Sequence, residues 1–342
     1  MRDEPTLFDV SGTDETALPQ QRSADTPISG DEALAEVEFW FRSQSDMESR
    51  FAACLRQSID EVLDGQRTGR FDVASLEKTE KTYLGTKVEI VLRDEFDLGR
   101  GAAMDYIVAG HEVDAKFTSG GNWTIPREAV GHMCLLMAAD DERSRFRVGL
   151  LRITNEALNA GTNQDGKRTV SQQGRASIRW LVGDRPLPEN LLLQMPPADR
   201  KAIFSASDGY RGSGNGGQLR INELLRRVHG RIIDRTTAVT VARQLDGPKR
   251  VRDARNHLRG EGIVVLGHQE DHPRIAQALR LPVPAKGSWV ATRLVRHPAG
   301  DPDRTVVIGG CRYAVALPGE PLEPAPSYYR TQRLRSDPAD MA

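Results

Sequence analysis

The sequence is poor in cysteine and has no long apolar run, and both absences narrow what the protein can be. Its three cysteines, Cys54, Cys134 and Cys311, lie far apart without metal-ligand spacing. This argues against structural zinc and fits a reduced cytoplasmic protein. No run of about 20 apolar residues is present, so we expect no transmembrane helix. The acidic, polar start also lacks the basic and apolar parts of a signal peptide.

Net charge is nearly absent too, but the charges are unevenly placed. The 342 residues carry a formal net charge of -1. Residues 1–50 hold 4 basic and 12 acidic side chains, a balance of -8, whereas residues 201–260 hold 13 basic and 5 acidic ones, a balance of +8. A local excess of positive charge is typical of a surface that binds a polyanion, although a solvated helix face would give the same count.

The first part of the chain predicts an α/β domain over residues 31–182. Before it, residues 1–30 are rich in Ser, Thr, Pro, Asp and Gly without apolar periodicity, and we expect a disordered acidic arm. Apolar residues at helical spacing predict two helices, and four short strand patterns follow. The helices are expected over 51–62 and 75–96, and the strands over 105–108, 112–118, 133–137 and 147–153. This order predicts a central mixed sheet flanked by helices.

The second part predicts a smaller, mainly α domain. We expect a linker over 183–189, the domain itself over 190–325, and a flexible tail over 326–342. Three helix patterns are followed by one strand pattern, in the order 219–230, 236–245, 248–259 and 263–266. That order is typical of a winged helix-turn-helix.

Two acids and a lysine form the most informative pattern. If residues 111–118 are a strand, Asp114 and Lys116 share one face, because side chains alternate. A tight turn at Ala109-Gly110 would bring Asp105 beside Asp114. Two carboxylates can hold Mg²⁺, which polarises a phosphate and activates water, and a lysine can orient that water. The pattern therefore predicts phosphodiester hydrolysis, and the alternative is a surface Asp–Lys pair on an edge strand.

Glu89 is a further candidate for the same centre. It lies in Val88-Glu89-Ile90-Val91-Leu92, an almost wholly apolar stretch. A carboxylate there is costly unless it is paired or bound to metal. The alternatives are a helix face that touches solvent, or an ion pair with Lys87 or Arg93.

Several long strings resemble the NaeI restriction endonuclease family, in the same order from about residue 60 to 319. In the first domain they are DGQRTGR (64–70), KTEKT (78–82), GTKVEI (85–90) and VDAKF (113–117). In the second they are NELLRRVHGR (222–231), EGI (261–263), GHQ (267–269) and LPVP (281–284).

The resemblance implies an enzyme with two functions. It implies a PD-(D/E)xK nuclease domain, followed by a helix-turn-helix domain that binds another copy of the target DNA and activates cleavage. Family enzymes act as homodimers with Mg²⁺ in bacteria and cut a GC-rich palindrome, GCCGGC in the prototype. By position, the catalytic acids would be Glu89, Asp105 and Asp114, the lysine Lys116, and a backbone metal ligand the carbonyl of Ala115. Met104 departs from the fold's consensus, which often has Pro before the first strand acid.

DNA contacts are expected at two places. In the 64–70 turn, the glycines would allow close approach to a DNA backbone, and Gln66, Arg67 and Arg70 could reach phosphates or base edges, although alone the turn could be a solvated loop. In the second domain, the helix over 248–259 would be the recognition helix, with Arg250 or Arg255 reading guanine and Asn256 a base edge or phosphate. The same helix also carries Lys249, Arg252 and Arg259. The first of the three helices supplies Arg226, Arg227 and Arg231, which would touch phosphates.

Two other functions remain open at this point. One is a nicking or repair endonuclease on the same fold. The other is a DNA-binding regulator whose first domain is an inert scaffold. The joint presence of Glu89, Asp105, Asp114 and Lys116 argues against the regulator.

Overall fold

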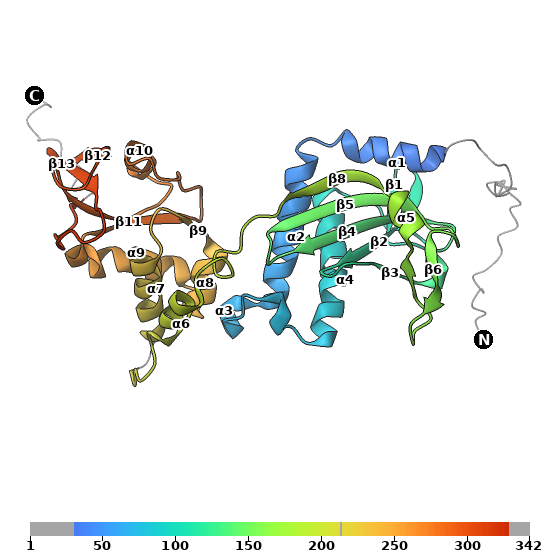
Figure 1. Ribbon diagram of the computed structural model, residues 1–342, viewed down its shortest axis with the longest axis horizontal. Helices are drawn as coiled ribbons and strands as arrows, with labels where there is room; N and C mark the ends of the chain where they lie inside the picture. Colours follow the sequence, from blue (N-terminus) through green and yellow to red (C-terminus); the bar gives the residue numbers. More distant parts are fainter. Residues whose placement is uncertain (1–30, 213, 328–342) are drawn as a thin grey trace, which may run out of the picture.

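The chain folds into two lobes that follow one another along the sequence (Figure 1). The computed structural model describes residues 31–212 and 214–327. The arm expected over 1–30 lies outside the described residues, as does the tail expected over 326–342 except for residues 326 and 327. Among the described helices, none has the length and apolarity that a membrane crossing needs.

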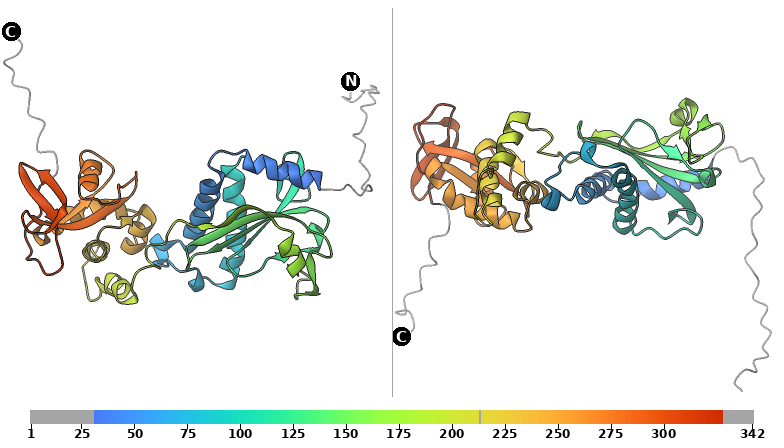
Figure 2. Two further views of the ribbon diagram at one scale, coloured as in Figure 1. Left: turned by 45° about the horizontal axis from the view of Figure 1, so that its top comes forward. Right: turned by 90° about the horizontal axis from the view of Figure 1, so that it is seen from below.

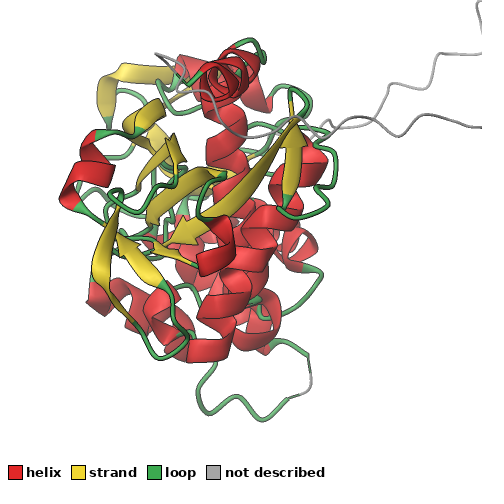
Figure 3. Ribbon diagram, turned by 90° about the vertical axis from the view of Figure 1, so that its right-hand side faces the viewer, coloured by secondary structure: helices red, strands yellow, loops and turns green. Residues whose placement is uncertain are grey.

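The first lobe is built on a mixed five-stranded sheet, as predicted. Its strand order is β1-β2-β4-β5-β8, and β2 and β4 are parallel whereas the other neighbours are antiparallel. The strands are β1 (Tyr106–Val108), β2 (His111–Thr118), β4 (Met133–Asp140), β5 (Arg145–Arg152) and β8 (Arg179–Pro186). The sheet twists strongly, as the yellow strands in Figure 3 show.

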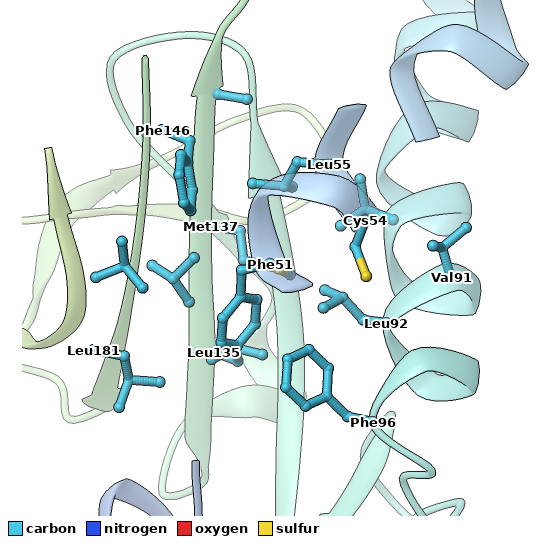
Figure 4. Close-up of a cluster of buried hydrophobic side chains, with 14 of the residues drawn as sticks. Phe51, Cys54, Leu55, Val91, Leu92, Phe96, Leu135, Met137, Phe146 and Leu181 are labelled. Atoms are coloured by element: carbon cyan, nitrogen blue, oxygen red, sulfur yellow. The ribbon is translucent and has the colours of Figure 1, made fainter. Parts of the chain in front are cut away.

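Helices cover one face of this sheet. They are α1 (Glu32–Arg42), α2 (Met47–Leu63) and α4 (Lys78–Glu95), and the short helices α3 (Gly65–Thr68) and η1 (Val73–Ser75) connect the last two. Phe51 and Leu55 of α2 and Leu92 of α4 pack against Leu135 and Met137 of β4 in one apolar core (Figure 4). The helical spacing that predicted α2 and α4 is the spacing of these buried residues.

The opposite face is covered by a small second sheet. Its order is β3-β7-β6, from β3 (Thr124–Ile125), β6 (Leu158–Thr162) and β7 (Arg168–Val170), with η2 (Arg127–Ala129) and α5 (Gln172–Ala176) nearby in the chain. Trp123, Ile125 and Val170 pack there against Cys134 and Leu136 of β4. The central sheet is therefore covered on both faces, and polar side chains lie on its β1–β2 side, where Asp114 and Lys116 point away from the helices.

The second lobe has the predicted order of helices and first strand, but more strands than predicted. Its helices are α6 (Pro197–Ser205), α7 (Gly216–Arg227), α8 (Arg235–Ala242), α9 (Gly247–His257), η3 (Arg259–Glu261) and α10 (His272–Ala278). Its strands are β9 (Ile232–Ile233), β10 (Ile263–Leu266), β11 (Trp289–Arg296), β12 (Asp301–Ile308) and β13 (Cys311–Val315). The sheet runs β10-β11-β13-β12, with β9 also on β11, so "mainly α" understates its strand content.

The connection between the lobes is shorter than the linker expected over 183–189. Strand β8 continues to Pro186, because Arg185 and Pro186 pair with Phe146 and Arg145 of β5. Leu187 then packs into the core of the first lobe and is 2% exposed. The chain therefore leaves the first lobe only after Leu187.

The two lobes also touch through a segment that is distant from this connection in sequence but lies beside it in space, where the Asn190 side chain donates to the Phe71 carbonyl at 2.7 Å. Helix α3 of the first lobe packs on α8 of the second, and both views in Figure 2 place the blue segment that contains α3 between the lobes. A Cβ atom on Gly65 would lie 2.1 Å from Oγ1 of Thr240. The ring of Phe71 stacks on that of Phe204, with centroids 5.6 Å apart. This contact fixes the segment between α2 and α4 against the second lobe.

Candidate active site and DNA-binding surfaces

The predicted hairpin is present and sets the position of the two strand acids. Ala109 and Gly110 both have positive φ, 51° and 82°, as a two-residue hairpin turn with the right-handed strand twist requires. Tyr106 pairs with Val113, and Val108 with His111. One step beyond the Tyr106–Val113 pair, Asp105 comes to lie opposite Asp114.

Asp105, Asp114 and Lys116 make direct contacts at this point. The Ala115 N–H donates to Oδ2 of Asp105 at 2.7 Å. The Lys116 ammonium donates to Oδ1 of Asp114 at 2.8 Å and lies 2.7 Å from Oδ2. It also donates to the Ala115 carbonyl at 3.0 Å. Four of the predicted residues therefore share one small polar site.

Side chains alternate between the two faces of β2, as predicted, and this places Asp114 and Lys116 on the face away from the helix core. Val113 lies in the core under the helices, and Ala115 and Phe117 pack against that core. Asp114 points to the other face, where the Cys134 thiol of β4 donates to its Oδ2 at 3.4 Å. Asp114 is only 6% exposed, so its charge depends on the partners at hand.

Burial shapes the electrostatics of Asp114. Desolvation raises the pKa of its carboxyl group, the Lys116 ammonium lowers it, and the nearby Asp105 carboxylate raises it further. Burial dominates, and the net direction is upward. Two acids that disfavour each other's charge in a partly buried site favour the binding of a cation.

Glu89 approaches the same site from helix α4. Its side chain is 25% exposed and accepts a hydrogen bond from Arg93 at 2.9 Å, so the Arg93 pair considered as an alternative does form. Arg93 also donates to the backbone carbonyl of Asp105 at 3.2 Å. Burial, followed by the charge of Asp105, raises the pKa of Glu89, whereas Arg93 and Lys116 lower it. Glu89 is thus close enough to interact electrostatically with Asp105 and Lys116.

The carboxylates are neighbours but not a preformed metal cage. Over residues 31–212 and 214–327, no three His, Cys, Asp or Glu side chains lie in an arrangement that could hold a metal ion. Asp114 is paired with Lys116, and Glu89 with Arg93. The donor set itself fits Mg²⁺, which prefers a few carboxylate and carbonyl oxygens and keeps several waters.

The glycines of the 64–70 turn lie against the second lobe. Gly65 and Gly69 approach Thr240 and Arg243 of the second lobe, so their lack of a side chain allows this contact between the lobes. Arg70 is held by two hydrogen bonds to Glu80, at 2.8 and 2.9 Å. Arg67 remains exposed beside Asp64, and Gln66 is half-buried.

The arginines of α7 and of the turn after it are engaged within the chain. Arg226 makes two 2.8 Å hydrogen bonds to Glu261, and Arg227 contacts Asp199 at 2.7 Å. Arg231 pairs with Glu189 at 2.7 Å. A phosphate would have to compete with these carboxylates for all three guanidinium groups.

Helix α9 presents a basic outer face. Gly247, Val251 and Ala254 are buried, so the residues that turn outward are those on the opposite side of the helix. These outward residues are Lys249, Arg252 and Asn256, all exposed. The two arginines expected to read guanine lie on the flanks: Arg250 pairs with Asp246 at 3.1 Å, and Arg255 donates to the carbonyl of Val265 at 3.0 Å. Arg259 is also exposed and donates to the Ala325 carbonyl.

Two residues of the catalytic region were missed as functional candidates. Arg93 stands four residues after Glu89, a spacing that places both on one side of a helix, so the sequence did carry that signal. Cys134 meets Asp114 because β2 and β4 pair in parallel with these two residues opposite each other. No local pattern signals that pairing.

Comparison with known proteins agrees with this geometry. Residues 37–324 match the family described as "Restriction endonuclease NaeI". The chain is also 46% identical over 301 residues to the "Type II restriction enzyme NaeI" of Lentzea aerocolonigenes. That alignment covers 86% of this chain and 94% of the relative, so the similarity extends through both lobes.

Proposed function

This chain belongs to the NaeI restriction endonuclease family, and from that premise we propose that it is a type II site-specific deoxyribonuclease that makes double-strand cuts in a GC-rich palindrome, GCCGGC. We further propose that it acts with Mg²⁺, as a homodimer, in the cytoplasm where its DNA substrate lies. The observation that carries the proposal is the β1–β2 hairpin, which sets Asp105 beside Asp114 and Lys116.

Each residue of the site has a definite task in hydrolysis. Asp105, Asp114 and the Ala115 carbonyl would hold Mg²⁺, with Glu89 as a further carboxylate. When bound, Mg²⁺ polarises the phosphate and makes a bound water a better nucleophile. Lys116, held at Asp114 and the Ala115 carbonyl, orients the attacking water and offsets the negative charge that grows on the phosphate oxygens. The helix core behind β2 keeps this strand rigid, so the groups stay in position.

The second lobe would bind another copy of the target and control the first. Helices α7, α8 and α9 followed by β10 have the order of a winged helix-turn-helix, and β9 and β10 both pair with β11. Helix α9 supplies the basic outer face that such a domain lays in a major groove. The contact of α3 with α8 offers a direct route from the DNA-bound second lobe to the segment that leads into α4 and Glu89.

Plasmid cleavage tests the proposal. Supercoiled plasmid with GCCGGC sites is incubated with the protein in Mg²⁺ or in EDTA, next to a plasmid that lacks the site. We expect linear products with ends at GCCGGC in Mg²⁺ only. Single nicks would favour the nicking or repair reading, and binding without cleavage would favour the regulator and contradict the enzyme.

Addition of DNA in trans tests the control by the second lobe. A plasmid with one GCCGGC site should be cut faster when a short duplex with that site is added. A duplex with a scrambled site is the control. Equal rates with both duplexes would remove the effector role.

A further inference from the structure

A cleft lies beyond the end of the strand that carries Asp114 and Lys116. Its walls are residues 119–121, which follow β2, and the β4–β5 hairpin with Asp140, Arg143, Arg145 and Arg147. No residue of 31–212 or 214–327 fills this cleft, and no step of hydrolysis described above uses it.

Arg147 lies on the same face of the sheet as Asp114. Thr118 of β2 pairs with Ala138 of β4, and Ala138 pairs with Arg147 of β5, so the three form one row across the sheet. Phe146 points into the core under the helices, and Arg147 therefore points to the opposite face. From strand spacing, Arg147 is about 12 Å from Lys116, a length of about three to four base-pair steps of DNA.

The guanidinium of Arg147 is held in place by aromatic rings. Its central carbon lies 5.3 Å from the ring centre of Trp123 and 5.5 Å from that of Trp180. Trp123 is itself fixed, since it is 1% exposed and its indole N–H donates to the Met137 carbonyl at 2.7 Å. Stacking on indoles orients the planar group and leaves its N–H edge for an anion.

The acids of the cleft are already paired with other arginines. Arg143 contacts Asp140 at 3.0 Å, and Arg145 contacts Asp184 at 2.8 Å. Across the part of the chain that the structure describes, Arg147 forms no ion pair with a carboxylate. Arg147 thus supplies the positive charge that the carboxylates of the cleft do not neutralise at contact distance.

The glycines of the other wall leave the cleft open. A Cβ atom on Gly121 would meet nothing within 4 Å, and one on Gly120 would meet only Oγ1 of Thr118, at 3.6 Å. This differs from Gly65, whose missing side chain is required by packing. Small residues at an unfilled place allow a ligand backbone to approach closely.

We propose that Arg147 binds a phosphate of the substrate DNA backbone in this cleft and so aligns the duplex along β2 with its target phosphate at Asp114 and Lys116. A guanidinium fixed by stacking matches a phosphate with two parallel hydrogen bonds. The inference rests on the proposed nuclease function, and it assigns Arg147 to binding and not to the chemical step.

The test compares Arg147→Gln with Arg185→Gln. Arg185 belongs to the same sheet but pairs with Phe146 and lies near Glu48 of α2, so it is on the helix-covered face. Binding of a short fluorescent GCCGGC duplex is measured in EDTA at several salt concentrations, with each substitution placed in an Arg252→Ala background so that the second lobe contributes less to the signal. For Arg147→Gln we expect about tenfold weaker binding and a salt slope smaller by about 0.9, the value for one lost phosphate contact. Arg185→Gln should leave both unchanged.

Cleavage kinetics in Mg²⁺ give a second readout. Arg147→Gln should raise the DNA concentration for half-maximal rate and leave the rate at saturating DNA nearly unchanged, because the lost contact is the same in ground and transition states. Unchanged affinity and salt slope would overturn the proposal, as would a loss of maximal rate alone. If the wild-type protein neither binds nor cuts the duplex, the proposed nuclease function fails. If the wild type binds and cuts but Arg147→Gln has the same affinity and salt slope, only the proposed role of Arg147 fails.

A second variant covers the case in which Arg147→Gln unfolds. Gly121→Asp adds a carboxylate to the open wall without a clash, so circular dichroism and the unfolding midpoint should match the wild type. It should weaken DNA binding by repulsion of phosphate. If the folded Gly121→Asp protein binds DNA as tightly as the wild type, the cleft is not a DNA site.

Discussion

At the scale of single residues, Lys116 is placed directly at the acids of the site. Its ammonium donates to Asp114 and to the Ala115 carbonyl. We expect Lys116→Ala to cut at least about 100-fold more slowly, as when one transition-state donor is removed, while DNA binding is kept. Single-turnover cleavage and a binding assay in EDTA measure the two effects.

Lys87→Ala is the matched control for that variant. Lys87 pairs with Glu61 of α2, away from the hairpin. It should cut at the wild-type rate. If Lys116→Ala also cuts at that rate, Lys116 is not catalytic and the Asp–Lys pair is only a surface ion pair.

Glu89 allows a test between its two roles. As a metal ligand, Glu89→Gln should cut about 10- to 100-fold more slowly and need more Mg²⁺ for half-maximal rate. As a mere partner of Arg93, it would change only stability, and by less than about 1 kcal/mol since the pair is partly exposed. Cleavage rates over a Mg²⁺ series, with urea unfolding beside them, decide which is correct.

The residue-scale predictions from sequence succeeded where a local rule applied. Asp105 and Asp114 are brought together by a two-residue turn and by strand alternation, and both rules are read from neighbours in the chain. The indole rings that hold Arg147 come from Trp123 and Trp180, which are 57 residues apart in sequence. Their meeting depends on how the small β3-β7-β6 sheet and β8 pack, and no spacing rule predicts it.

At the scale of elements, the α3–α8 contact requires glycine at position 65. We expect Gly65→Ala to lower the free energy of unfolding by about 1–3 kcal/mol, the usual cost of overpacking. Thr240→Ala in the same protein should restore part of it, because Oγ1 and Cγ2 of Thr240 are two of the three nearest atoms. Urea unfolding of the single and double variants measures this.

Gly85→Ala is the control for that substitution. Gly85 lies in α4, and a Cβ there meets nothing within 4 Å. Gly85 is half-buried with open space around it, so the change should stabilise the helix by up to about 1 kcal/mol. A loss of stability with Gly85→Ala comparable to that of Gly65→Ala would show that the contact with Thr240 is not the cause.

Helix α9 makes a separate prediction about arginines. Arg252→Ala should weaken activation by added GCCGGC duplex without a change in stability, because its side chain is exposed on the outer face. Arg226→Ala should instead lower stability, because it removes two hydrogen bonds to Glu261. Equal effects of both variants on activation would contradict the assignment of α9 as the recognition helix.

Elements with strong local periodicity were predicted, and some with the same signal were overlooked. Helix α1 was not expected, although Asp31 caps it and Leu34, Val37 and Phe41 have helical spacing. Strands β12 and β13 were also overlooked, although Ile308 pairs with Cys311 across a two-residue turn at Gly309-Gly310, which is a local signal. Strand β11 has a different cause, because one of its partners is β10, which is distant in sequence. The contact of the 64–70 turn with α8 was likewise not predicted, because α8 is distant in sequence.

At the scale of the whole molecule, a buried charge cluster lies where the lobes meet. Arg56 is shared between Asp60, at 2.6 Å, and Asp141, and Asp234 of the second lobe is near enough to act on Asp60. Burial, only partly offset by Arg56, raises the pKa of Asp60 to about 6. The single positive charge of Arg56 therefore cannot neutralise all of these carboxylates at once.

This cluster predicts how stability depends on pH. Since the pKa of Asp60 is raised in the folded state, the folded protein binds more protons than the unfolded chain between the ordinary aspartate pKa of 3.8 and about 6. Its contribution to stability is therefore present below that window and is lost as pH rises through it. Asp60→Asn should flatten this fall, measured as urea midpoints from pH 4 to pH 7. A wild-type midpoint that rises through the window and an unchanged slope in the variant would contradict it.

The β1–β2 hairpin also bears on the order in which the site comes together during folding. Asp114 follows Asp105 by only nine positions, so closing that loop costs little chain entropy, and hairpins of this kind form within about 1–10 μs. Glu89 belongs to α4 and joins the pair only when that helix docks on the sheet. Asp105 and Asp114 are thus brought together by local chain geometry. Glu89 reaches them only once the first lobe has its native packing.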